Sequence, residues 1–75
     1  MRYFFHVVGI KTTESPIIDK NGEEFVQDAD ALAHAATIAS ELGRDGGMDR
    51  FAVMITDERG KQVGQLPIEP RGRGC

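Results

Sequence analysis

Cysteine and long apolar runs are nearly absent from this chain of 75 residues. The single cysteine, Cys75, excludes an intramolecular disulfide that could reinforce a small core. A chain without disulfides fits a reducing compartment, and we expect a cytoplasmic protein. No stretch reaches the roughly 20 apolar residues of a membrane-spanning helix. The apolar run at residues 3–10 is too short and too interrupted for a secretory signal, so we expect no association with a membrane.

Positive charge is also scarce. The chain has 9 Lys and Arg residues against 12 Asp and Glu residues, which gives a net charge of −3. Arg71 and Arg73 lie in the last five residues, and leaving these two out of the nine gives 7 basic against 12 acidic residues, or −5, for residues 1–70. An acidic body disfavours nucleic-acid binding by the folded part.

Motifs that carry chemistry are missing as well. The sequence has no CxxC or HxxxH spacing, no glycine-rich phosphate loop and no Ser/His/Asp constellation. His6, His34 and Cys75 are scattered along the chain, so we expect no metal site and no cofactor. Residues 19–24 resemble the start of a calcium loop, but glycine falls at the fourth position instead of the sixth and no helices flank it, which favours a simple turn.

Aromatic residues are few, and three of the five cluster in the first strand-like segment. Residues 3–8 combine aromatic and β-branched side chains, a composition typical of a β-strand. Alternation sends Tyr3, Phe5 and Val7 to one face and the intervening side chains to the other. Both faces are then largely apolar, which indicates that both must be covered.

The remaining elements follow from turn and capping residues. Residues 17–26 predict a small hairpin, or a single edge strand with a kinked exit, around a turn that ends at Gly22. An alanine-rich helix is predicted over residues 29–42, with Asp28 as its N-cap and Gly43 as a left-handed residue after its end.

The second half of the chain predicts two further strands. These cover residues 51–56 and 61–66, joined by a tight turn in which Gly60 is available for a left-handed conformation. The later strand leads into Pro67, which indicates the edge of a sheet. Residues 69–75 have little to bury, and we expect a disordered Arg/Gly tail.

The order β-β-α-β-β predicts a single α+β domain over residues 1–68, with one helix on one face of an antiparallel sheet of three to four strands. The face under the helix is expected to present six apolar side chains: Tyr3, Phe5, Val7, Phe51, Val53 and Ile55. The opposite face is expected to serve self-association through Phe4, His6, Val8, Met54 and Leu66. An apolar patch of a few hundred Å² is larger than a monomer usually exposes, so we expect a homodimer, sheet to sheet or through a shared edge. The alternative is that the loop at residues 9–16 or the tail covers this face.

Several blocks resemble a family of short uncharacterised bacterial proteins, a domain of unknown function frequent in rhizobia and other alphaproteobacteria. The resemblance rests on the opening Arg2-Tyr3-Phe4-Phe5-His6-Val7, the turn at residues 19–22, the alanine-rich helix and the hairpin at residues 53–60. It spans about residues 2–66, and it departs from the family in having Phe51 without a tryptophan before the third strand. The resemblance implies the fold and a bacterial cytosolic origin, and it brings no activity.

The two histidines have structural interpretations. His6 has no nucleophile or carboxylate on its own strand, which favours a sheet-face residue bonded to a neighbour. His34 lies on a polar helix stripe with Asp30, Thr37 and Glu41 that is expected to face water.

The sequence therefore favours a non-enzymatic cytosolic interaction or regulatory module that self-associates and can bind an unidentified protein partner. One alternative is a nucleic-acid-linked, antitoxin-like regulator that uses paired Arg-Gly tails. The other is a ligand or catalytic pocket at a dimer interface near His6.

Overall fold

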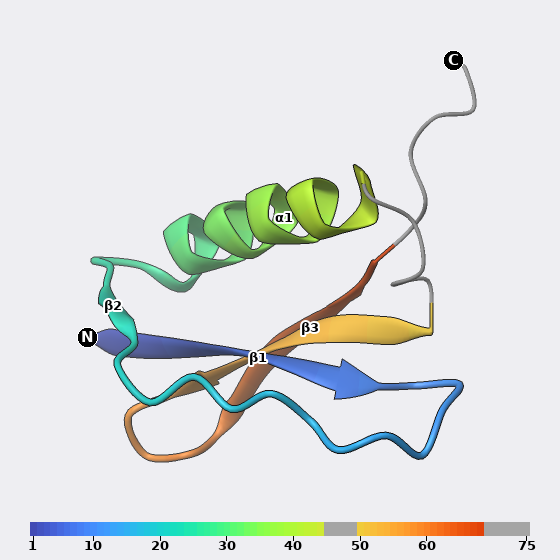
Figure 1. Ribbon diagram of the computed structural model, residues 1–75. Coiled ribbons are helices and arrows are strands. Elements are labelled where there is room, and N and C mark those ends of the chain that lie inside the picture. Colours follow the sequence, from blue (N-terminus) through green and yellow to red (C-terminus); the bar gives the residue numbers. More distant parts are fainter. Residues whose placement is uncertain (45–49, 69–75) are drawn as a thin grey trace.

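The computed structural model describes residues 1–44 and 50–68. Four strands form one antiparallel sheet in the order β2-β1-β3-β4, and helix α1 lies across one face of it (Figure 1). The elements are β1 (Arg2–Gly9), β2 (Glu23–Glu24), α1 (Asp28–Arg44), β3 (Phe51–Asp57) and β4 (Gln62–Pro67). The predicted α+β class with one helix on one face is confirmed. The prediction for the tail at residues 69–75 lies outside the described residues.

The two central strands, β1 and β3, pair along nearly their whole length. Their register runs from Tyr3 opposite Asp57 to Gly9 opposite Phe51. This pairing buries the side of β1 that faces α1, where Tyr3 is 2 % exposed, together with Val53 and Ile55 of β3. Phe5, Val7 and Phe51 pack against the same cluster, so the set of side chains predicted to lie under the helix is confirmed.

Helix α1 rests on the sheet through a stripe of very small residues. Ala31, Ala35 and Ala39, spaced four apart, are buried in the core cluster, and Gly43, four residues farther on, is also buried. The first helical hydrogen bonds run from Asp30 and Ala31 to the carbonyl of Gln27, so Gln27 takes the N-cap position predicted for Asp28.

The prediction that Gly43 ends the helix in a left-handed conformation is wrong. Among the described residues only Gly22 and Gly60 have positive φ, and the helix continues through Gly43 to Arg44. Gly43 follows the alanine stripe at the same four-residue spacing and is buried like it.

The segment at residues 17–26 is a single interrupted edge strand, the second of the two predicted alternatives. Ile17 forms an isolated bridge with Val7, and β2 pairs with Arg2 and Tyr3 farther along the same edge of β1. Between them the chain turns, and Gly22 there has the positive φ predicted for it, at 70°.

Leu66 lies on the face under α1, so its predicted place on the opposite face is wrong. It stands directly opposite Val53, which is fully buried, and it packs against the same core. Its side is set by the register with β3, which shifts at a bulge between Ile55 and Thr56. The alternation of side chains along a strand sorts them into two faces, but only the pairing with the neighbouring strand decides which face lies against the core.

Candidate functional site

The face of the sheet opposite α1 brings together four of the five residues predicted for it. Register places Phe4, His6 and Val8 of β1 on this face, with Met54 beside His6 on β3. The phenyl ring of Phe4 and the imidazole of His6 are parallel, with ring centroids 6.5 Å apart. Phe4, Val8 and Met54 are half-buried, and His6 is buried. We call Phe4, Val8 and Met54 the open-face triplet.

His6 is held by hydrogen bonds at both ring nitrogens. The backbone N–H of Asp19 donates to Nδ1 over 3.1 Å, and Nε2 lies 3.0 Å from the hydroxyl oxygen of Thr56. A nitrogen that accepts an N–H bond carries no proton, so in the neutral ring the proton lies on Nε2 and is donated to Thr56.

This tautomer determines what the pair can do chemically. A general base must accept a proton from the nucleophile it activates, but Nε2 already carries one and points it at Thr56. The His6–Thr56 pair is therefore arranged as a structural link between β1 and β3, in agreement with the interpretation drawn from the sequence.

The side chain of Asp19 binds a backbone group on the edge of β1 that faces away from β3. Its Oδ2 accepts the backbone N–H of Phe5, a group that a neighbouring strand would otherwise bind, while Oδ1 accepts the amides of Asn21 and Gly22. Burial raises the pKa of the Asp19 carboxyl, but these three hydrogen bonds outweigh it and hold the pKa below its ordinary value. Sequence reasoning singled out Asp19 only as a turn residue and missed its link to His6.

Replacing Asp19 by asparagine is expected to lower stability by about 1–2 kcal/mol at neutral pH, because the bonds to a partly exposed carboxylate weaken when its charge is lost. The lowered pKa means that this stabilisation is present above the ordinary Asp value of 3.8 and is lost as pH falls through the still lower folded-state pKa. Urea unfolding of Asp19→Asn and of the parent at pH 7 and pH 3 measures both effects.

The matched control is Asp57→Asn, since the Asp57 carboxylate accepts the amides of Lys61 and Arg59, and these bonds likewise lower its pKa. Both variants should show a smaller loss of stability on acidification than the parent. An unchanged pH dependence in Asp19→Asn would contradict the role assigned to its carboxylate.

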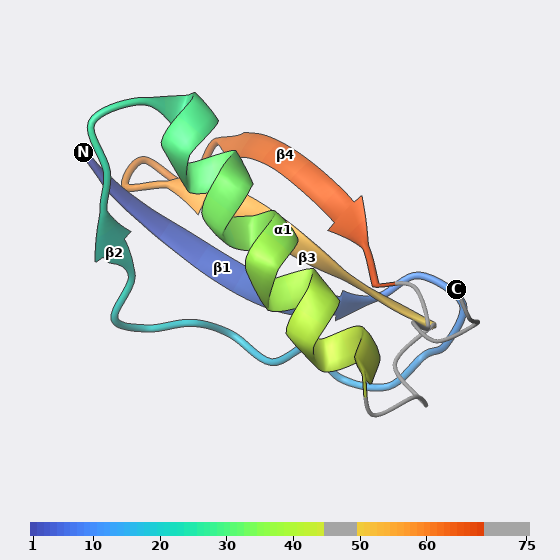
Figure 2. The ribbon, with the colours of Figure 1, turned by 90° about the horizontal axis from the view of Figure 1, so that it is seen from above.

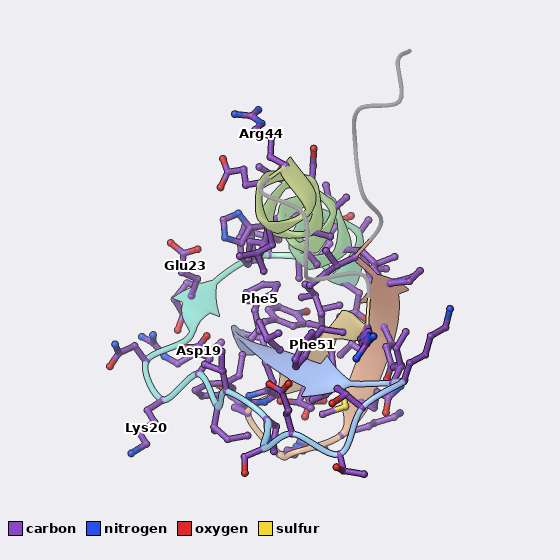
Figure 3. The ribbon with its side chains drawn as sticks, turned by 45° about the vertical axis from the view of Figure 1, so that its right-hand side comes forward. Phe5, Asp19, Lys20, Glu23, Arg44 and Phe51 are labelled. Atoms are coloured by element: carbon purple, nitrogen blue, oxygen red, sulfur yellow. The ribbon has the colours of Figure 1, made fainter. Side chains whose placement is uncertain are left out.

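His34 does not lie on a solvated stripe as predicted. Its ring contacts those of Phe5 and Phe25, with centroids 5.1 and 5.3 Å away, and Nε2 lies 2.9 Å from a carboxylate oxygen of Glu23. Figure 3 shows Glu23 on β2, beside the gap in which Phe5 points from β1 toward the helix. Because β2 passes along that flank of α1, a position that helical spacing alone assigns to water becomes half-buried.

Tyr3 connects the same flank to the start of the helix. Its hydroxyl donates to Oδ1 of Asp28 over 2.5 Å. This hydrogen bond, together with burial and the nearby negative charge of Asp28, raises the pKa of Tyr3 to about 12. Asp28 therefore fixes the helix to β1.

Neither a metal centre nor a membrane span is found in the described part of the chain. Within residues 1–44 and 50–68, no three His, Cys, Asp or Glu side chains gather as potential ligands of a metal ion. In the same ranges, no helix has the length and apolar character needed to cross a bilayer. The candidate site is the sheet face opposite α1, with its polar link through His6.

Comparison with known proteins gives one match. No curated protein and no solved structure matches the chain. The model of the family described as a domain of unknown function, DUF6894, matches residues 2–69, which is nearly the whole chain. The family match agrees with the resemblance to a domain of unknown function, and the chain belongs to the DUF6894 family.

Proposed function

We propose that this chain is a non-catalytic interaction module that self-associates through the sheet face opposite α1. The observation that carries the proposal is that the helix covers one face of the sheet, while apolar side chains on the other face stay partly exposed. Helix α1 lies over one face, while the open-face triplet of Phe4, Val8 and Met54 lies on the other. A second copy that places the same face against it would remove these apolar side chains from water.

The polar groups of this face support binding over catalysis. Both nitrogens of His6 are engaged within the chain, and the proton on Nε2 is directed at the one hydroxyl that it contacts. The carboxylate of Asp19 is occupied by backbone amides. A surface whose polar atoms are satisfied internally loses little when it is dehydrated against a partner.

The setting of this module is part of the proposal. A bacterial cytoplasm fits a chain whose only cysteine is Cys75 and whose composition offers no disulfide. In that compartment the module would act by presenting its assembled form to a partner protein.

Introducing a charge into the open-face triplet is expected to halve the solution mass. In Phe4→Glu the carboxylate would be buried without a partner at the contact, which opposes association strongly. Light scattering coupled to size-exclusion chromatography under reducing conditions measures the mass as a multiple of 8.2 kDa. Because Phe4 also packs near Gly22, Met54→Glu serves as a second variant on the neighbouring strand.

The control is Val26→Glu, which adds the same charge at an apolar side chain that is 87 % exposed in the turn before α1. Its mass should equal that of the unsubstituted chain, and circular dichroism should show that all three variants remain folded. Association that survives both Phe4→Glu and Met54→Glu in folded protein, or a parent chain that is a monomer at 8.2 kDa, would refute the proposed interface.

A further inference from the structure

The two edges of the sheet differ in whether their outward backbone groups are hydrogen-bonded within the chain. On the β1 side, Val7 exchanges two backbone hydrogen bonds with Ile17, at 2.9 and 2.8 Å, and the amide of Phe5 is taken by Asp19. Strand β2 continues the cover along Arg2 and Tyr3. This edge is closed by the chain itself.

The other edge, formed by β4, turns backbone groups outward. The amide of Ile68 donates to the carbonyl of Phe51, so these two residues form a hydrogen-bonded pair of the β3–β4 ladder. Bonded and non-bonded pairs alternate in an antiparallel ladder, which makes Met54 and Gln65 a non-bonded pair. The N–H and C=O of Gln65 therefore point away from β3, toward the open edge.

Strand β4 also lacks the charges that usually protect an edge. None of its six residues, Gln62–Pro67, is charged. Lysine, other charges and proline are the common means of preventing strand addition. The single proline stands at the last position, where its missing N–H would point outward, so it removes a pairing group only at the end of the strand and leaves that of Gln65.

The flank of α1 above this edge is equally neutral. A Cβ on Gly64 would lie 2.7 Å from Cδ2 of Leu32, which places Leu32 over β4. Ala29 and Ala36, three residues before and four after Leu32, follow it along the same side of the helix and are exposed. The opposite flank carries the charged and polar side chains, namely Asp30, His34 and Glu41. Figure 2 shows α1 running obliquely across the sheet, with β4 on one side and β2 on the other.

We propose that β4 pairs antiparallel with β4 of a second copy of this chain, which extends the sheet across a two-fold axis. Such an axis places each edge and each helix flank against its own copy. The chain carries a net negative charge, so a surface that meets its own copy avoids repulsion when it is uncharged. Strand β4 is uncharged, and so is the helix flank above it that is formed by Ala29, Leu32 and Ala36. Small alanines let the two helices approach each other above the joined strands, while both charged flanks stay on the outside.

This interface uses a surface different from that of the proposed function, and the two can be tested separately. The first variant, Gln65→Pro, removes an outward N–H that makes no bond to β3, so the fold keeps its ladder while strand addition is blocked. The second, Ala36→Glu, places two carboxylates opposite each other across the axis. Each is expected to halve the solution mass measured by light scattering, and combining either with Phe4→Glu should give a monomer of 8.2 kDa.

The control is Thr37→Glu, which puts the same charge one residue farther along α1, where it faces away from β4. Its mass should be unchanged. Hydrogen exchange supplies a local readout, because the Gln65 amide should be protected in the assembled chain and exposed in Ala36→Glu. The proposal is overturned if Gln65→Pro and Ala36→Glu keep the parent mass, or if the Gln65 amide exchanges freely in the parent.

Discussion

Replacing Ile55 by alanine is expected to lower the free energy of unfolding by about 2–5 kcal/mol. Ile55 is fully buried in β3, between the stripe of α1 and the other strands. Its truncation removes apolar burial and leaves a cavity that the small alanines of the helix are too short to fill. A chain of this length has a total stability of roughly 4–11 kcal/mol. The substitution therefore removes a large share of it, and urea unfolding at neutral pH measures the loss.

The matched control shortens an apolar side chain that is already in water. Val26 is 87 % exposed, and Val26→Ala should change stability by no more than about 0.5 kcal/mol. If Ile55→Ala lowers the free energy of unfolding by less than about 1 kcal/mol, packing in the core beneath the helix contributes little to stability.

Replacing Gly22 by alanine is expected to lower stability by about 2–4 kcal/mol, from two sources that add. Its φ of 70° lies in the left-handed region, which disfavours an L side chain by about 1–2 kcal/mol. A Cβ here would also lie 2.8 Å from the carbonyl oxygen of Tyr3, which is backbone and cannot rotate away. To relieve this clash the turn must move off β1, which weakens the hydrogen bonds of Asp19.

Gly60→Ala separates the two sources. Gly60 has a similar φ, 82°, but a Cβ there would have nothing within 4 Å. Its substitution should lower stability by about 1–2 kcal/mol from backbone strain alone. The difference between the two variants in urea unfolding measures the contact with Tyr3, and equal losses would show that the close approach is unimportant.

The sequence was sufficient to predict the elements because local chemistry decides them. Alternation in residues 3–8, the alanine-rich helix and the turns at Gly22 and Gly60 each depend on neighbours in the chain. These features predicted the α+β class and the side chains under α1, and the structure agrees.

The errors share another cause, which is pairing between distant segments. Leu66 is assigned to a face by its register with Val53, and the environment of His34 is set by β2 passing beside the helix. The helix continues through Gly43, which is buried and has no positive φ. None of these relations is contained in a local pattern.

Sequence reasoning placed four of the residues opposite α1 on one face, and it missed the hydrogen bonds of that face. Phe4, His6, Val8 and Met54 share a face because adjacent strands keep alternation in phase. The contact between His6 and the backbone of Asp19 joins two segments of irregular spacing, and no periodicity indicates it.

The position of β1 also sets the order of events during synthesis. β1 precedes the other three strands of the sheet in the sequence but is central in the sheet, and its long partner β3 lies about fifty residues later, with Tyr3 opposite Asp57. Such distant pairing slows folding, because a long loop must close before its contacts form. Until β3 leaves the ribosome, the edge of β1 that pairs with it stays unpaired and is open to misassociation or to a chaperone. The β3–β4 hairpin, by contrast, closes between neighbouring residues. Its β3 strand then provides the edge with which β1 pairs.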